Sequence, residues 1–167
     1  MFFTKNLQNK ASEILKIAEQ KNLKISIAES CTGGLLSALF TDIDGSSKVF
    51  DRAFITYSNQ AKIEMLQVKK ELLDKYGAVS SEVAVSMAQG AIKNSTADIS
   101  IAITGIAGPE GGSSEKPVGL VYISILNRKH KQRIITRKFN FSGDRNEVRK
   151  SSIIEALEAI KLIITEN

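Results

Sequence analysis

Apolar residues recur every three to four positions in several stretches of the chain, which is the spacing of one buried helix face. Thr4 can cap the first of these helices. Its apolar face consists of Leu7, Ala11, Ile14, Leu15 and Ala18. Before the last stretch, Asp144 and Glu147 have the spacing of a capping box. The pattern predicts helices over about 4–18, 34–41, 59–66, 69–76, 80–94 and 144–165.

Shorter runs are continuously apolar or alternate with polar residues, as buried and half-buried strands do. These predicted strands are 24–28, 52–57, 98–104, 118–126 and 133–141. The last two are expected to pair as an antiparallel hairpin. Because helices and strands alternate along most of the chain, we expect residues 1–167 to form a single α/β domain. Its helices should cover both faces of a mixed, mainly parallel sheet.

The composition is that of a soluble globular protein, with 43% hydrophobic and 25% charged residues. No apolar run approaches the length of about 18 residues that a membrane helix needs. The first residues lack the apolar core of a secretory signal. Cys31 is the only cysteine and cannot form an internal disulfide, so we expect a reducing, cytoplasmic location.

The net charge of +5 raises the question of a nucleic-acid partner. Lysines are spread over the predicted helices, and the one dense basic cluster is residues 128–133, between the two strands of the hairpin. No aromatic residues interleave with this cluster to stack on bases. We therefore interpret it as a solvated hairpin tip and expect neither a nucleic-acid nor a membrane partner.

Three polar segments follow predicted strands, where ligand sites of α/β sheets collect. They are residues 29–34, 58–62 and 104–112. The only histidine, His130, falls in the basic hairpin tip, which argues against a serine–histidine triad. One histidine and one cysteine also exclude a zinc site built on such ligands. The base of a hydrolase here would be a lysine, a tyrosine or a carboxylate.

Lys62 is the best-placed candidate base. It lies in the first turns of a predicted helix, just after the strand that ends at Tyr57. The positive end of a helix disfavours a charged ammonium, which lowers a lysine pKa. A serine of the preceding turn, Ser46 or Ser47, or Ser30 of the first polar segment would then be the nucleophile. The alternative for Lys62 is an ordinary exposed helix lysine.

Several segments, in order, resemble the CinA C-terminal domain family. They are AESCTGG at 28–34, GSS at 45–47, YSNQAK at 57–62, GAVS at 77–80, TGIAGP at 104–109, GGSSEKPVG at 111–119 and FSGDR at 141–145. The resemblance runs from about residue 5 to the end. It implies a three-layer α/β/α sandwich and a nicotinamide-nucleotide amidase of pyridine nucleotide salvage. Such an enzyme hydrolyses nicotinamide mononucleotide to nicotinate mononucleotide and ammonia. Because the sequence has no cluster of metal ligands, we expect neither a metal nor a cofactor.

The resemblance implies catalytic roles for particular residues. Lys62 becomes the base and Tyr57 its partner. We favour Ser47 as the nucleophile, with Ser30 or direct attack by water as alternatives. Thr104 and the amides after it are expected to hold the oxyanion; the alternative is a threonine that caps its own turn.

The resemblance also implies the residues that bind substrate. The turn after the first strand supplies Glu29, Thr32, Gly33 and Gly34, and the loop after the third supplies Gly105 and Gly108. Arg145 is expected to bind the phosphate or a ribose hydroxyl; the alternative is an exposed helix arginine. We expect a stand-alone domain that assembles as a homo-oligomer, with a dimer favoured. A catalytically silent nucleotide-binding or regulatory module stays open as a second function.

Overall fold

The computed structural model describes residues 3–130 and 132–165 and contains one five-stranded sheet. The strands are β1 (Ile25–Glu29), β2 (Phe50–Ile55), β3 (Ile99–Gly105), β4 (Leu120–Asn127) and β5 (Arg133–Asn140). The helices are α1 (Lys5–Gln20), α2 (Leu35–Thr41), α3 (Asn59–Leu66), α4 (Lys70–Tyr76), α5 (Ser81–Lys93) and α6 (Arg145–Thr165). A 3₁₀ turn, η1 (Ser46–Lys48), precedes β2. Every predicted helix and strand is present, with ends shifted by a few residues.

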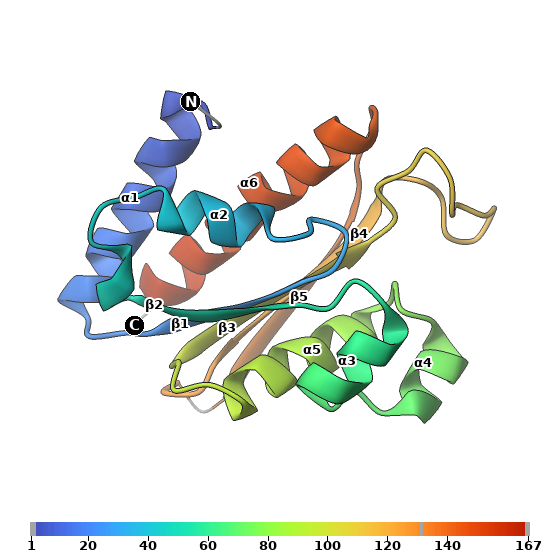
Figure 1. The fold of residues 1–167 in the computed structure, drawn as a ribbon, viewed down its shortest axis with the longest axis horizontal. Helices are drawn as coiled ribbons and strands as arrows, with labels where there is room; N and C mark the ends of the chain where they lie inside the picture. The colour runs from blue at the N-terminus through green and yellow to red at the C-terminus, as the bar shows by residue number, and fades with distance from the viewer. Residues whose placement is uncertain (1–2, 131, 166–167) are drawn as a thin grey trace.

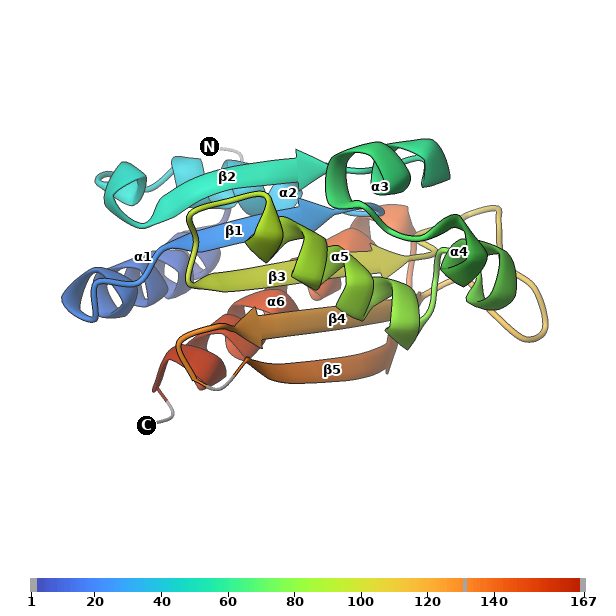
Figure 2. The same ribbon diagram turned by 90° about the horizontal axis from the view of Figure 1, so that it is seen from below.

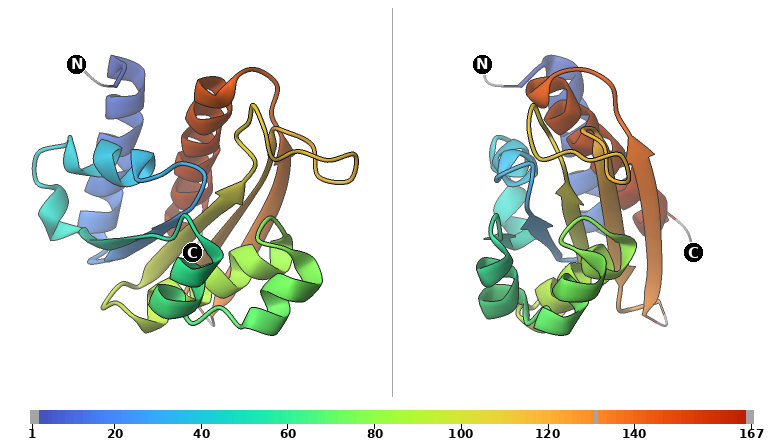
Figure 3. Two further views of the ribbon diagram at one scale, coloured as in Figure 1. Left: turned by 45° about the vertical axis from the view of Figure 1, so that its right-hand side comes forward. Right: turned by 90° about the vertical axis from the view of Figure 1, so that its right-hand side faces the viewer.

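The expected three layers are confirmed. Helices α1, α2 and α6 cover one face of the sheet, and α3, α4 and α5 cover the other (Figure 1). Figure 3 shows the same layers from two further sides. Each face has its own apolar core, because neighbouring strand residues point to opposite faces. Ile25 and Ile27 of β1 pack on the side of α1 and α6, whereas Ala28 packs on the side of α5.

The expectation of a mixed sheet is confirmed, but the description 'mainly parallel' is not exact, because two of the four strand pairings are parallel and two are antiparallel. The strand order is β2-β1-β3-β4-β5, in which β1 pairs parallel with β2 and β3, but β3–β4 and β4–β5 are antiparallel. Parallel pairing needs a crossover connection, usually a helix. Residues 106–119 form a loop without a helix, so the chain returns along β3 in the opposite direction.

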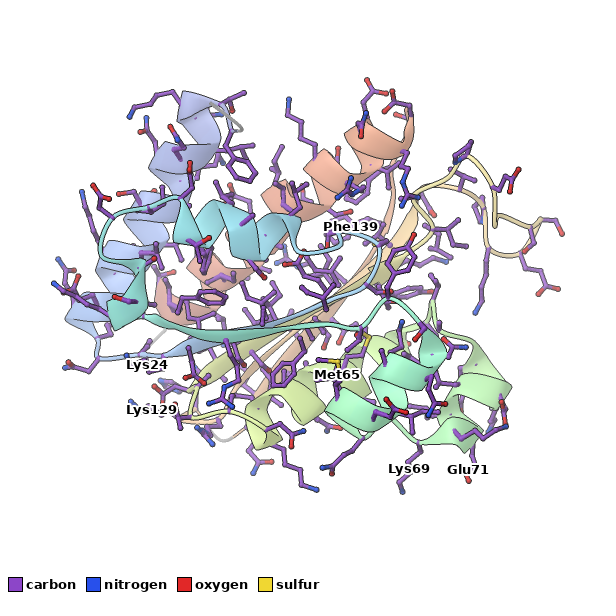
Figure 4. All side chains as sticks on the ribbon, in the orientation of Figure 1. Lys24, Met65, Lys69, Glu71, Lys129 and Phe139 are labelled. Atoms are coloured by element: carbon purple, nitrogen blue, oxygen red, sulfur yellow. The ribbon has the colours of Figure 1, made fainter. Side chains whose placement is uncertain are left out.

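The parallel half of the sheet determines where a site can form. The carboxyl ends of β1, β2 and β3 lie side by side at one end of the sheet, where α3 begins (Figure 2). α3 is held there by close packing on α5, since a Cβ at Gly90 would lie 2.1 Å from the Leu66 carbonyl oxygen. The β4–β5 hairpin tip lies at the opposite end of the strands, where the Lys24 N–H and the Lys129 ammonium both contact the Asp98 carboxylate; Figure 4 labels the two lysines. Lys131 of the basic cluster lies outside the described residues.

Candidate active site

A cavity of about 240 Å³ opens at the carboxyl ends of the parallel strands. It brings together all three polar segments that the sequence places after strands. Its lining includes Ser30, Tyr57 and Lys62, together with residues 104–108 and Arg145. The segment that joins α4 to α5 also contributes to the wall, through Ala78 and Val79.

Among the described residues, Lys62 is the only lysine that lines this cavity, and it is buried, with 1% of its surface exposed. Ser58 caps α3 by accepting the Ala61 N–H at 3.0 Å, which places Lys62 one turn into the helix. The Lys62 Nζ donates to Ser30 Oγ at 3.1 Å and to the Thr56 carbonyl at 2.8 Å. Within the described residues it has no carboxylate partner.

The electrostatic consequence is a lysine that loses its proton easily. Burial in this pocket lowers the pKa of Lys62 from 10.5 to about 8. An uncompensated cation is costly away from water, which favours the neutral amine. Near neutral pH a substantial fraction of Lys62 can therefore accept a proton. The alternative of an exposed helix lysine is wrong.

Ser30 follows β1 directly and is held by its own main chain. Its N–H donates to the Ile103 carbonyl at 3.0 Å, and its carbonyl accepts the Gly33 N–H at 3.0 Å. The side chain faces Lys62 and is nearly buried, at 7% exposure. The neighbouring Cys31 is no competing nucleophile, because burial raises the pKa of its thiol to about 12.

Ser47 lies elsewhere. It belongs to η1, before β2, whereas Lys62 belongs to α3, after β2. A strand of this length separates the two by roughly 20 Å, at 3.2–3.4 Å per residue. The Ser47 side chain is exposed and lies at the amino end of β2, whereas the cavity lies at the carboxyl end. The structure thus places Ser30 next to the lysine, and not Ser47, which the sequence analysis favoured. Spacing along the chain does not show which end of β2 faces the lysine.

Tyr57 lines the cavity, but its hydroxyl does not contact Lys62. The ring is 62% exposed, and the hydroxyl accepts a hydrogen bond from Arg145 Nη2 at 3.0 Å. Arg145 Nη1 donates to the Gly108 carbonyl at 2.9 Å. Arg145 is half-buried and connects the segment after β2 to the loop after β3. Its side chain also lines the cavity.

The turn after β1 contributes main chain more than side chains. Gly33 and Gly34 have φ of +60° and +92°, a conformation that favours glycine. The Glu29 carboxylate points away from the cavity and accepts hydrogen bonds from the start of α2. Thr32 is buried, and its carbonyl accepts from Arg149 Nη2 at 2.9 Å. Glu29 and Thr32 thus support the turn, which was not evident from their positions in the sequence.

Thr104 is buried, and its hydroxyl donates to the Ala78 carbonyl at 2.8 Å. That proton is therefore not directed at a ligand; the hydroxyl ties β3 to the segment before α5. Gly105 and Gly108 line the cavity, as expected. Among the described residues, the loop N–H groups of Ala107 and Gly108 have no hydrogen-bond acceptor, so they are free to hold an anionic oxygen.

Sequence reasoning missed three contributors to the site. The Thr56 carbonyl accepts a hydrogen bond from Lys62 Nζ, and Arg149 donates to the Thr32 carbonyl in the turn after β1. Glu110 lines the cavity. A main-chain acceptor leaves no signature in a side-chain pattern. Glu110 and Arg149 look like ordinary surface residues until the fold places them.

Other features offer less chemistry. A larger groove of about 700 Å³ runs along α5, but its charged residues, Lys69, Glu82 and Lys93, are exposed. Over the described ranges, no group of three or more histidine, cysteine or carboxylate side chains could hold a metal ion. None of the helices in those ranges is both long and apolar enough to span a bilayer.

The chain is similar to known proteins over nearly its whole length. It is 49% identical over 151 residues to a putative competence-damage inducible protein of Caldicellulosiruptor saccharolyticus, covering 90% of this chain and 36% of that protein. It is 45% identical over 156 residues to the nicotinamide-nucleotide amidohydrolase PncC of Escherichia coli K12, covering 89% and 93%. The chain spans about a third of the length of the first of these curated relatives and nearly all of the second.

A solved structure has the same fold. The competence/damage inducible protein CihA of Agrobacterium tumefaciens superposes with a TM-score of 0.94 at 40% identity, and the match covers 99% of both chains. The profile of the CinA C-terminal domain matches residues 7–164. The chain belongs to the CinA C-terminal domain family.

Proposed function

We propose that this protein is a nicotinamide-nucleotide amidase that uses Ser30 as nucleophile and Lys62 as general base. One observation carries the proposal: the Nζ of a buried lysine lies 3.1 Å from Ser30 Oγ in a cavity of about 240 Å³. A serine is a weak nucleophile until an adjacent base activates it, and here the base is an amine whose pKa burial lowers. Similarity to the E. coli nicotinamide-nucleotide amidohydrolase supports the substrate.

The reaction has two steps: acylation of Ser30 with release of ammonia, and hydrolysis of the resulting ester. Neutral Lys62 accepts the Ser30 proton while Ser30 Oγ attacks the carboxamide carbon. The C–N bond then breaks, and the leaving nitrogen takes the proton from the Lys62 ammonium and departs as ammonia. Water attacks the resulting ester with Lys62 again as base, and nicotinate mononucleotide leaves as Ser30 regains its proton. The amides of Ala107 and Gly108 are the proposed oxyanion donors.

We assign substrate recognition to the Arg145 side of the cavity. The remaining N–H groups of Arg145 can bind the 5′-phosphate, and the exposed face of the Tyr57 ring can cover the pyridinium. A charge-assisted contact contributes about 1.5–3 kcal/mol. Nicotinamide riboside, which lacks the phosphate, should therefore have a kcat/KM lower by roughly 10- to 150-fold. Equal kcat/KM for the two compounds would rule out a phosphate anchor.

The direct test is incubation with nicotinamide mononucleotide and quantification of the acid product and of ammonia. Stoichiometric release of both supports the proposal. Binding of the nucleotide without turnover would identify the chain as the silent nucleotide-binding module instead.

Two further features belong to the same proposal. Catalysis should need no metal, because the proposed steps use only a serine, a lysine and water, so dialysis against a chelator should leave the rate unchanged. We also keep a cytoplasmic homo-dimer as the expected state. Sedimentation at several protein concentrations measures the assembly.

A further inference from the structure

Glu29 is the last residue of β1 and has an unusual environment for a carboxylate. Its side chain is fully buried. Oε2 accepts the N–H groups of Gly34 at 3.1 Å and Leu36 at 3.2 Å. Oε1 accepts the N–H of Ser37 at 2.9 Å and its hydroxyl at 2.6 Å. Within the described residues no lysine or arginine pairs with it.

The contacts of Glu29 hold the chain on both sides of Ser30, the proposed nucleophile. Because strand neighbours point to opposite faces, the Glu29 side chain enters the layer of α1, α2 and α6, while that of Ser30 faces α3. The hydrogen bonds to residues 34–37 close a loop that contains Ser30. The Glu29 carbonyl also accepts the Thr56 N–H at 2.8 Å, and the carbonyl of Thr56 accepts Lys62 Nζ.

A buried carboxylate is costly unless it is fully hydrogen-bonded. Here four donors satisfy it, three of them amides at the positive end of α2. These contacts fix where the turn leaves β1, and so fix the position of Ser30 Oγ relative to Lys62. We propose that Glu29 is a positioning residue, whose carboxylate anchors the Ser30 turn against α2. The role of Ser30 rests on the proposed function.

Glu29→Gln is the sharpest variant, because it keeps the shape but turns one acceptor into an N–H₂ group that faces amide donors. A misplacement of about 1 Å at a reacting group can cost about 10²-fold in rate. We expect kcat to fall by about that factor, with KM changed by less than about threefold. The pH midpoint of the rate should stay unchanged, since Glu29 does not contact Lys62.

Two matched variants separate positioning from stability. Ser37→Ala removes one of the four donors and should lower kcat by about threefold. Ile163→Ala opens the core near the far end of α6, so it should lower the melting temperature without lowering kcat at a temperature well below unfolding. Loss of kcat in Glu29→Gln that the equally destabilised Ile163→Ala shares would overturn the proposal.

A second measurement is independent of the nicotinamide substrate. A fluorophosphonate probe, followed by peptide mass spectrometry, reports how fast Ser30 is modified. Slower labelling in Glu29→Gln, and a smaller decrease in Ser37→Ala, support the positioning role. Equal labelling in wild type and Ser37→Ala overturns it, even if Glu29→Gln does not fold. Wild-type protein that is labelled at Ser30 but does not hydrolyse nicotinamide mononucleotide contradicts only the proposed substrate.

Discussion

A serine and a lysine lie close together at both ends of β2, and only one of these pairs is suited to catalysis. At the amino end, Ser47 and Lys48 are exposed, and Lys48 Nζ lies 2.7 Å from Glu19 Oε1. That carboxylate raises the pKa of Lys48. At the carboxyl end, Lys62 is buried beside Ser30, and burial lowers its pKa to about 8. The pKa values of the two lysines are thus shifted in opposite directions, Lys48 upward and Lys62 downward.

The difference shows that the environment, not the residue pair, makes a base. An exposed lysine beside a carboxylate is held in its charged form and cannot accept a proton. A buried lysine whose partners are a carbonyl and a hydroxyl has no charge to stabilise the ammonium. Parallel pairing of β1 with β2 creates this second environment, because it brings Ser30 and Lys62 to one edge of the sheet.

Serine substitutions at the two ends should give the largest contrast. Ser30→Ala removes the proposed nucleophile and should lower kcat by at least about 10⁴-fold, as nucleophile removal does in serine hydrolases. Ser47→Ala should keep kcat within about twofold, since changes at exposed surface positions are usually small. Steady-state ammonia release measures both. A dead Ser47→Ala enzyme with an active Ser30→Ala enzyme would reverse the assignment.

The same comparison applies to the lysines. Lys62→Met keeps much of the side-chain volume and removes the amine, so turnover should fall by roughly 10²- to 10⁴-fold, the contribution of a general base. Lys48→Met removes an exposed ion pair and should leave turnover unchanged. Circular dichroism checks that both variants fold. If Lys62→Met kept a tenth of the wild-type rate, another group would be the base.

Much of this arrangement could be predicted from the sequence. Apolar spacing places the eleven helices and strands found in residues 3–130 and 132–165, and the three polar segments after strands meet in one cavity. Elimination of His130 leaves a lysine, a tyrosine or a carboxylate as the base, and Lys62 lies in that cavity. These inferences succeed because periodicity, caps and strand ends are local properties of the chain.

The remaining features depend on tertiary contacts. The choice between Ser30 and Ser47 depends on which strand end faces α3, and both serines look alike in the sequence. The hydroxyl of Tyr57 bonds Arg145, 88 positions away in the chain, rather than the nearby Lys62. The direction of the Glu29 side chain follows from the register of β1, and its donors come from the next helix. No local pattern encodes these pairings.

The pH dependence sharpens the lysine comparison further. The rate should rise with pH through one ionisation near 8 and then level off, because only neutral Lys62 is a base. Stability should follow the same group. The folded pKa lies below the unfolded value, so the unfolded chain binds more protons between about pH 8 and 10.5. The contribution of Lys62 to stability should therefore rise with pH across that window.

The size of the stability effect follows from the shift. Lowering the pKa of Lys62 from 10.5 to about 8 corresponds to roughly 3 kcal/mol. The free energy of unfolding of wild type minus that of Lys62→Met should increase by roughly this amount between pH 7.5 and 11. Urea unfolding of both proteins measures the difference, in which other titrating groups cancel. A pH-independent difference would mean that the pKa of Lys62 is the same in the folded and unfolded states. The matching wild-type and Lys48→Met pair should show a smaller change of the opposite sign, because the pKa of Lys48 is raised.

The smallest expected effect concerns Thr104. Its substitution tests whether the Thr104 hydroxyl supports the wall of the cavity or takes part in catalysis. An oxyanion donor contributes about 10²- to 10³-fold to kcat. The Thr104 hydroxyl donates instead to the Ala78 carbonyl at 2.8 Å, on the wall of the cavity.

Thr104→Val keeps the shape and removes only that hydrogen bond, so it should cost about 1 kcal/mol of stability. Its kcat should stay within about tenfold of wild type, well short of the loss of an oxyanion donor. Thr104→Ser retains the hydroxyl and should keep the wild-type kcat, whereas loss of the buried methyl group should lower its stability by about 1 kcal/mol. A 10²-fold fall in kcat for Thr104→Val with unchanged melting temperature would instead place this hydroxyl on the oxyanion, and the amides of Ala107 and Gly108 would lose that role.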